Sequence, residues 1–153
     1  MLERRREKRR GRAAARLIHA ELSDIAAYVE ASLLRRAWLA DPAGALEGES
    51  WKQWRAALAE APGFEGWYPI SGAWGWISQL GQILELLGEG AGADPLDDKD
   101  PEFFKIGLLQ LAIADKALSD YAKTKSYSDP PNPDAPSSAE QIDALLNAAM
   151  KVD

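Results

Sequence analysis

Apolar side chains recur every three or four residues in each long segment of this chain, and this spacing predicts α-helices that bury one face. In the first segment, expected from about residue 3 to residue 39, the stripe begins near Leu17 and comprises Ile18, Leu22, Ile25, Val29 and Leu33. No segment alternates polar and apolar residues for long enough to indicate a β-strand. We therefore predict an all-α fold.

Capping residues predict where two of the later helices begin. Ser50 is the expected N-cap of a second helix, which ends before the Pro62-Gly63 pair. Asp100 is the expected N-cap of a fourth helix that runs to about residue 123, with Pro101 at its first position. Both helices carry an apolar stripe that predicts one buried face.

A third helix is expected between these two, as a short turn over 64–68 followed by a helix over 69–87. Its three glycines indicate either close backbone approach to a neighbour or local flexibility: Gly72, Gly75 and Gly81. Prolines mark residues 126–137 as an extended linker, and apolar spacing predicts a last helix over 138–153 that docks on the bundle. We predict an irregular antiparallel bundle of about five helices with a long first helix, its body spanning residues 17–125.

A strongly basic arm, residues 1–16, precedes the body. It holds eight basic and two acidic side chains, so its net charge is +6, whereas the whole chain carries −6 and the rest therefore carries −12. Because these parts have opposite charges, we expect them to bind opposite partners. The arm lacks apolar neighbours and is expected to project or fray. The predicted anion-binding side chains are Arg4, Arg5, Arg6, Lys8, Arg9, Arg10, Arg12 and Arg16.

Three interpretations of this arm are open: contact with an anionic membrane surface or an acidic protein, contact with the phosphates of nucleic acid, and a merely solvated helix end. The arm has no aromatic residue, and no Asn or Gln precedes Gln53, which disfavours base recognition. It also has no apolar face for insertion into a bilayer. We favour electrostatic contact with an anionic surface.

The six tryptophans supply a second set of candidate residues. The spacing of Trp51 and Trp54, and of Trp67 and Trp74, favours a role in the core over the alternative of an aromatic ligand pocket. Trp76 lies off the apolar stripe of its helix, so we predict that it is exposed and is a candidate surface for a protein partner.

Groups for catalysis or metal binding are scarce. The chain has no cysteine, which excludes disulfides, thiolate nucleophiles and Cys-ligated metals. The acidic loop at 94–102 departs from the EF-hand pattern, and we interpret it as a solvated loop with a helix cap. We predict no catalytic residue, no metal site and no cofactor.

Two titratable residues need a separate interpretation. His19, the only histidine, has no carboxylate three or four positions away on its helix, so we interpret it as a surface or boundary residue. Asp115 lies on an apolar stripe and must be paired or partly solvated. We expect a structural ion pair, for which the candidate partners are Arg35, Arg36 and Arg55.

Three stretches together resemble a group of uncharacterised bacterial helical proteins. They are residues 12–22, the motif Trp51-x-x-Trp54-Arg55-x-x-Leu58, and Trp67 with Ile70, Trp74 and Ile77. In many of those proteins a transmembrane helix precedes a basic juxtamembrane helix and a cytoplasmic helical domain. The resemblance covers about residues 1–85 and implies no known activity. This chain departs from the pattern because it has no apolar run approaching 18 residues, so the membrane helix would be missing.

These observations predict a non-enzymatic helical interaction or scaffold protein, whose basic arm contacts an anionic membrane surface or an acidic partner. The arm lacks the apolar segment of a secretory signal, so we expect a cytoplasmic, membrane-proximal location. Two alternatives are kept: a nucleic-acid-associated protein that binds phosphates through residues 4–16, and a bundle that binds a small ligand through its tryptophans.

Overall fold

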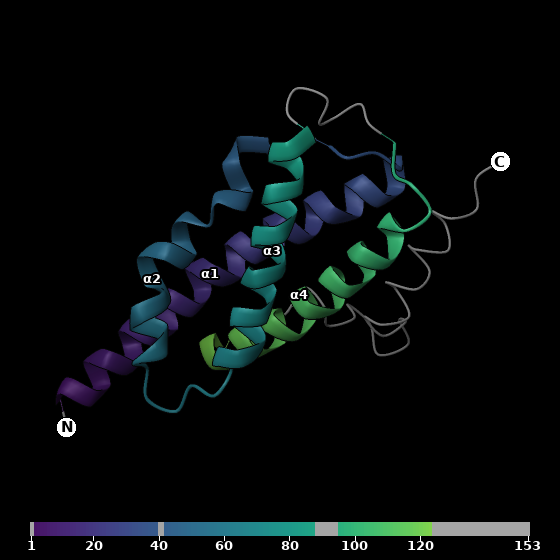
Figure 1. Cartoon of the computed structure of the whole chain (residues 1–153). Coiled ribbons are helices and arrows are strands. Elements are labelled where there is room, and N and C mark those ends of the chain that lie inside the picture. The colour runs from purple at the N-terminus through teal and green to yellow at the C-terminus, as the bar shows by residue number, and fades with distance from the viewer. Residues whose placement is uncertain (1, 40–41, 88–94, 124–153) are drawn as a thin grey trace.

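The computed structural model describes residues 2–39, 42–87 and 95–123, and these form an all-α fold (Figure 1). The elements are α1 (Leu2–Arg35), a short 3-10 helix η1 (Pro42–Glu47), α2 (Glu49–Ala59), α3 (Trp67–Leu87) and α4 (Asp100–Ala122). The all-α prediction is confirmed, with four α-helices in these ranges. The predicted linker over 126–137 and the predicted fifth helix over 138–153 lie outside the described residues.

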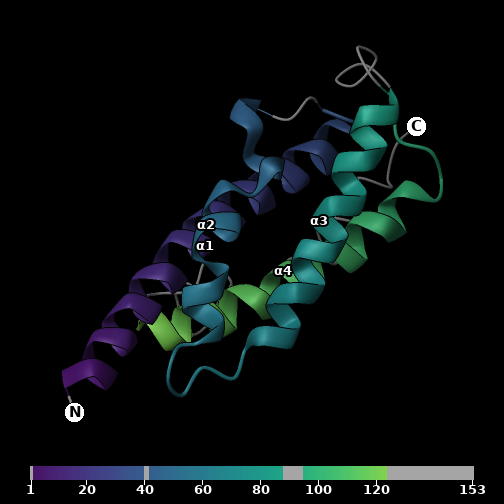
Figure 2. The same ribbon diagram turned by 60° about the vertical axis from the view of Figure 1, so that its left-hand side comes forward.

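The helices are arranged around α1, which packs along both α4 and α2, while α3 packs on α4 (Figure 2). Helices α1 and α4 are antiparallel. Gly11 lies beside Tyr121, His19 beside Asp115, and Trp38 beside Asp100, so the residue numbers run in opposite directions. The core between the helices is formed mainly by aliphatic side chains, with Phe104 the largest that is fully buried.

The first helix is continuous over 34 residues, which corresponds to about 51 Å. Every residue from Leu2 to Arg10 is exposed, and burial begins at Gly11 and continues through Ala14 and Ala15. The packed part therefore begins six residues before Leu17, where the sequence placed it. Small side chains are the reason, because glycine and alanine allow close helix packing without adding to the apolar stripe on which the prediction relied.

The C-terminus of α1 also differs from the prediction, since the helix ends at Arg35 rather than near residue 39. Arg36 takes a left-handed conformation with φ of 54°, and the Ala37 N–H donates to the Ser32 carbonyl. This turn directs the chain across the bundle, where the Leu96 N–H donates to the Arg36 carbonyl. Trp38 then packs on Phe104 with ring centroids 5.1 Å apart.

The start of α2 is capped from another helix. The prediction of Ser50 as N-cap is wrong, because the helix begins at Glu49 after Gly48. Instead, the Ser50 and Trp51 N–H groups donate to the two carboxylate oxygens of Glu21 on α1, at 2.8 and 3.1 Å. Gly48 has a φ of 71°, and a Cβ there would lie 2.8 Å from the Trp74 ring, so both conformation and space require glycine.

Helix α3 is one element that starts at Trp67, rather than a turn followed by a helix from residue 69. Pro69 is tolerated because it lies in the first turn, where its missing N–H would have had no helical partner. Of the two alternatives for its three glycines, close backbone approach does not occur, since a Cβ at Gly72, Gly75 or Gly81 would meet nothing within 4 Å.

Candidate functional site: the basic end of the first helix

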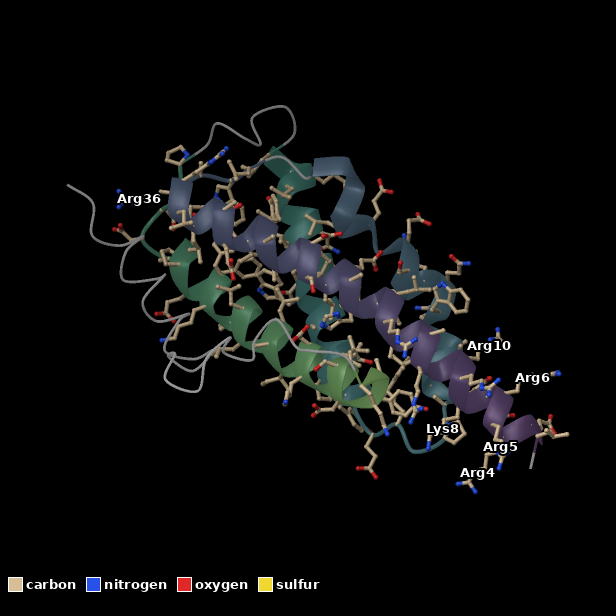
Figure 3. The ribbon with its side chains drawn as sticks, turned by 180° about the vertical axis from the view of Figure 1, so that it is seen from behind. Arg4, Arg5, Arg6, Lys8, Arg10 and Arg36 are labelled. Carbon is tan, nitrogen blue, oxygen red and sulfur yellow. The ribbon has the colours of Figure 1, made fainter. Side chains whose placement is uncertain are left out.

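The projecting end of α1, residues 2–10, carries six of the eight predicted anion-binding residues. Figure 3 shows Arg4, Arg5 and Lys8 on one side of the helix and Arg6 and Arg10 on the other. All five are exposed, as is Arg9. Within the part of the chain that the structure describes, the ion pairs found are His19–Asp115 and Lys116–Asp120, and neither involves these cations. These exposed cations are therefore accessible to an anionic partner.

Two acidic residues accompany the six cations. Glu3 and Glu7 are four positions apart, so they share one face of the helix, and Arg10 lies on that face too, three positions after Glu7. The other five cations are distributed around the rest of the helix. The net charge of residues 2–10 is therefore +4.

The remaining two predicted cations lie beyond this end, in the packed part of the helix. Arg16 is exposed, whereas Arg12 is half-buried, and its Nε is buried without a hydrogen-bond partner among the described residues. Burial raises the pKa of the Tyr121 hydroxyl, and the nearby Arg12 guanidinium offsets part of that effect. Arg12 is thus part of the junction between arm and body rather than of the freely exposed surface.

The junction itself is a close contact around Gly11. A Cβ at this position would lie 2.4 Å from the Ala61 Cβ, so a side chain here would push α1 away from the loop that precedes α3. Tyr121 closes the other side, where its hydroxyl donates to the Pro62 carbonyl at 3.0 Å and its ring meets Phe64 edge-on. The arm therefore emerges from a firmly packed base.

The body contains one buried histidine–carboxylate pair, formed by two residues that the sequence did not connect. His19 Nε2 lies 2.6 Å from Asp115 Oδ1, and Asp115 is completely buried. Asp115 is paired, as predicted, but with His19, and this contact is an ion pair only when the imidazole is protonated. None of the three arginines named as candidate partners forms an ion pair with it among the described residues. The interpretation of His19 as an ordinary boundary residue missed this partner, because the carboxylate comes from α4 and not from its own helix.

Trp76 is not an exposed partner surface, which corrects the prediction. It is 4% exposed, and its Nε1 donates to the Phe103 carbonyl at 3.1 Å. The reason is Gly107 on α4, where a Cβ would lie only 2.1 Å from the indole ring. The absence of a side chain there creates the space that Trp76 fills, and it brings α3 against α4.

Three other indoles form a stack between α2 and α3. Trp51 lies between Trp67 and Trp74, with ring centroids 5.4 and 5.6 Å away. Trp74 is buried, Trp51 and Trp67 are half-buried, and the Trp74 Nε1 has no hydrogen-bond partner among the described residues. The rings fill the space between the two helices with each other, so they act as packing. The predicted core role is thus supported for Trp74 and in part for its neighbours.

The acidic loop before α4 is a helix cap, as the interpretation of its sequence proposed. Asp97 Oδ1 accepts the N–H groups of Lys99 and Asp100, and Asp100 Oδ2 accepts the Asp97 N–H at 2.7 Å. The N-cap is Lys99 and not Asp100, and Asp100 also accepts the Trp38 indole N–H. Among the residues that the structure describes, no group of three potential ligands could hold a metal ion.

None of the described helices is long and apolar enough to cross a membrane. A scan of protein-family models, a search of curated proteins and a search of solved structures each found no match to this chain. The resemblance to bacterial juxtamembrane proteins therefore stays a prediction.

Proposed function

We propose that this protein is a non-enzymatic helical interaction domain that binds an anionic membrane surface through residues 2–10 of α1. The observation that supports the proposal is the position of six exposed cations on a helix end that extends beyond the other helices (Figures 1 and 3). The bundle behind it holds this end in place and presents the remaining surface to protein partners.

The length of the projecting end suits such a contact. Residues 2–10 extend for about 13 Å as a helix. Charges in physiological salt are screened over about 8 Å. The rest of the chain is strongly acidic and would be repelled by an anionic surface at close range. Because the projecting end is longer than the screening distance, it can contact lipid phosphates while the acidic body stays outside the repulsive range.

The chemistry of the end favours a charged surface over the alternatives. Leu2 is its single large apolar residue, so insertion into the hydrocarbon core would gain little. Nucleic acid offers the same phosphate chemistry, but the arm lacks the aromatic and amide side chains that would add stacking or base contacts. Nucleic-acid binding is therefore the competing outcome of the test.

The test is vesicle flotation with the full chain, at several salt concentrations. Vesicles that contain about 30% phosphatidylserine should carry the protein upward, and neutral phosphatidylcholine vesicles should not. Each cation near an anionic surface contributes about 1 kcal/mol. Replacing Arg4, Arg5 and Arg6 by glutamine should therefore weaken binding by about 3 kcal/mol, or roughly 100-fold.

A matched control removes three exposed cations from the body: Lys52, Arg55 and Lys99 are each replaced by glutamine. Net charge changes equally in both variants, so a general charge effect predicts equal loss. Equal loss, or binding to neutral vesicles as well, would contradict the proposal. A mobility shift with DNA or RNA at physiological salt, without vesicle binding, would support the nucleic-acid alternative.

A further inference from the structure

Helix α4 exposes an apolar stripe on the face that points away from the core. Ile106, Leu109 and Ile113 are separated by three and four positions, so they lie in one row. Their exposed fractions are 52%, 38% and 57%. Isoleucine is a weaker helix former than alanine or leucine. Two isoleucines on an outer helix face therefore indicate a surface that packs against something.

We propose that this stripe is the docking site of residues 138–153 of the same chain. The sequence of that segment supplies a complementary row at helical spacing, made of Ile142, Leu145, Leu146 and Ala149. The row from residue 142 to 149 spans seven positions, as does the row from 106 to 113. Each therefore measures about 10 Å along a helix, and one can cover the other.

The intervening segment is long enough to allow this contact. Residues 124–137 number fourteen and include four prolines, and an extended proline-rich chain of that length reaches about 43 Å. The stripe lies closer than that, since Ile113 is about 15 Å and Ile106 about 25 Å from Lys123 along α4. The linker can therefore return the segment to the outer face of the helix that it follows.

A second copy of the chain is a poorer occupant. Stable protein–protein interfaces bury about 800 Å² on each partner, and three partly exposed side chains offer far less. A tethered segment does not need such an area, because its covalent connection to α4 holds it at an effective concentration of roughly the millimolar range. A small apolar row can therefore bind a segment of its own chain even though it is too small to hold a dimer together.

The chain contains no cysteine, so a pair of introduced cysteines can form a disulfide only with each other or with the same residues of another chain. Full-length chain with Ile113→Cys and Leu146→Cys should form an intramolecular disulfide under mild oxidation. The control is Tyr68→Cys with Leu146→Cys. Tyr68 is 88% exposed on α3, close to Gly66, which packs on Ala117 of α4. A tail that is not docked would reach both introduced cysteines and should form the two disulfides at similar rates. A tail docked on α4 should form the disulfide with Cys at position 113 at least ten times faster.

Equal rates for the two pairs would overturn the proposal, and a disulfide between two chains would show that a second copy covers the stripe. A second measurement does not depend on disulfide geometry. The Ile106→Glu, Ile113→Glu variant changes only exposed side chains and should leave the core intact. It should speed chymotrypsin cleavage after Leu145 and Leu146 at least fivefold, and an unchanged cleavage rate would also overturn the proposal.

Discussion

The two parts of α1 share one continuous helical backbone and differ in what surrounds them. Residues 2–10 are exposed on all sides and are mostly basic, whereas residues 11–35 contribute eleven buried positions to the bundle. The change occurs at Gly11, within one turn, and not gradually. A helix can therefore be stabilised by packing over about three quarters of its length while its end stays exposed.

The largest expected effect comes from removing a core side chain in the packed part. Leu22 is completely buried, so Leu22→Ala should lower the free energy of unfolding by about 2–5 kcal/mol. Leu2 is 83% exposed, and Leu2→Ala should change it by less than about 0.5 kcal/mol. Urea unfolding followed by tryptophan fluorescence measures both. Similar losses for the two variants would contradict the described boundary.

The next effect comes from the His19–Asp115 pair. His19→Ala removes the imidazole that lies against a completely buried carboxylate, and such losses cost about 3 kcal/mol. His19→Gln retains an N–H donor and should recover part of that stability. The same unfolding measurement applies. If both variants were as stable as the parent chain, the pair would not contribute to stability.

A smaller loss of folding stability is expected when the carboxylate that caps α2 is removed. Glu21→Ala leaves the Ser50 and Trp51 N–H groups without their carboxylate and should cost about 1–2 kcal/mol. Asp24→Ala is the control, since Asp24 lies on the same helix, is exposed and carries the same charge. Thermal unfolding compares the two variants. A loss as large for Asp24→Ala would indicate a general charge effect instead of capping.

The smallest effect concerns Glu30, whose pKa burial raises above its ordinary value. A raised carboxyl pKa means that folding favours the neutral form, so the stability it contributes is present at acidic pH and is lost as pH rises through the folded-state pKa. Glu30→Gln should therefore match the parent chain at acidic pH and be more stable near neutral pH, by less than about 0.5 kcal/mol. A pH series of unfolding curves measures the difference, and an advantage at acidic pH alone would contradict it.

Local patterns predicted the helices well, because apolar spacing and turn residues act within a few positions. The stripe from Ile18 to Leu33 is buried as expected, whereas α3 starts at Trp67 and not at the predicted residue 69. Glycine and alanine contacts were less visible. These residues allow close packing because their side chains are small or absent. A prediction based on the spacing of large apolar residues does not detect them.

The errors at the candidate sites share one physical cause, which is contact between residues far apart in the chain. His19 and Asp115 are brought together by the antiparallel packing of α1 and α4. The local sequence predicted Ser50 as the N-cap of α2, but the first N–H groups of that helix are capped by the Glu21 carboxylate from α1. Trp76 is buried because Gly107 on α4 leaves room for its ring. Each required knowledge of a partner on another helix. The basic end needed no partner, so its exposure was predictable from charge alone.

The cap that Glu21 places on α2 also bears on the order in which the chain folds. Helix α2 has only eleven residues and buries a single side chain, Leu58. An isolated helix of that length is marginal in water. We therefore expect α2 to form only once α1 is in place, with the two helices gaining and losing structure as one cooperative unit.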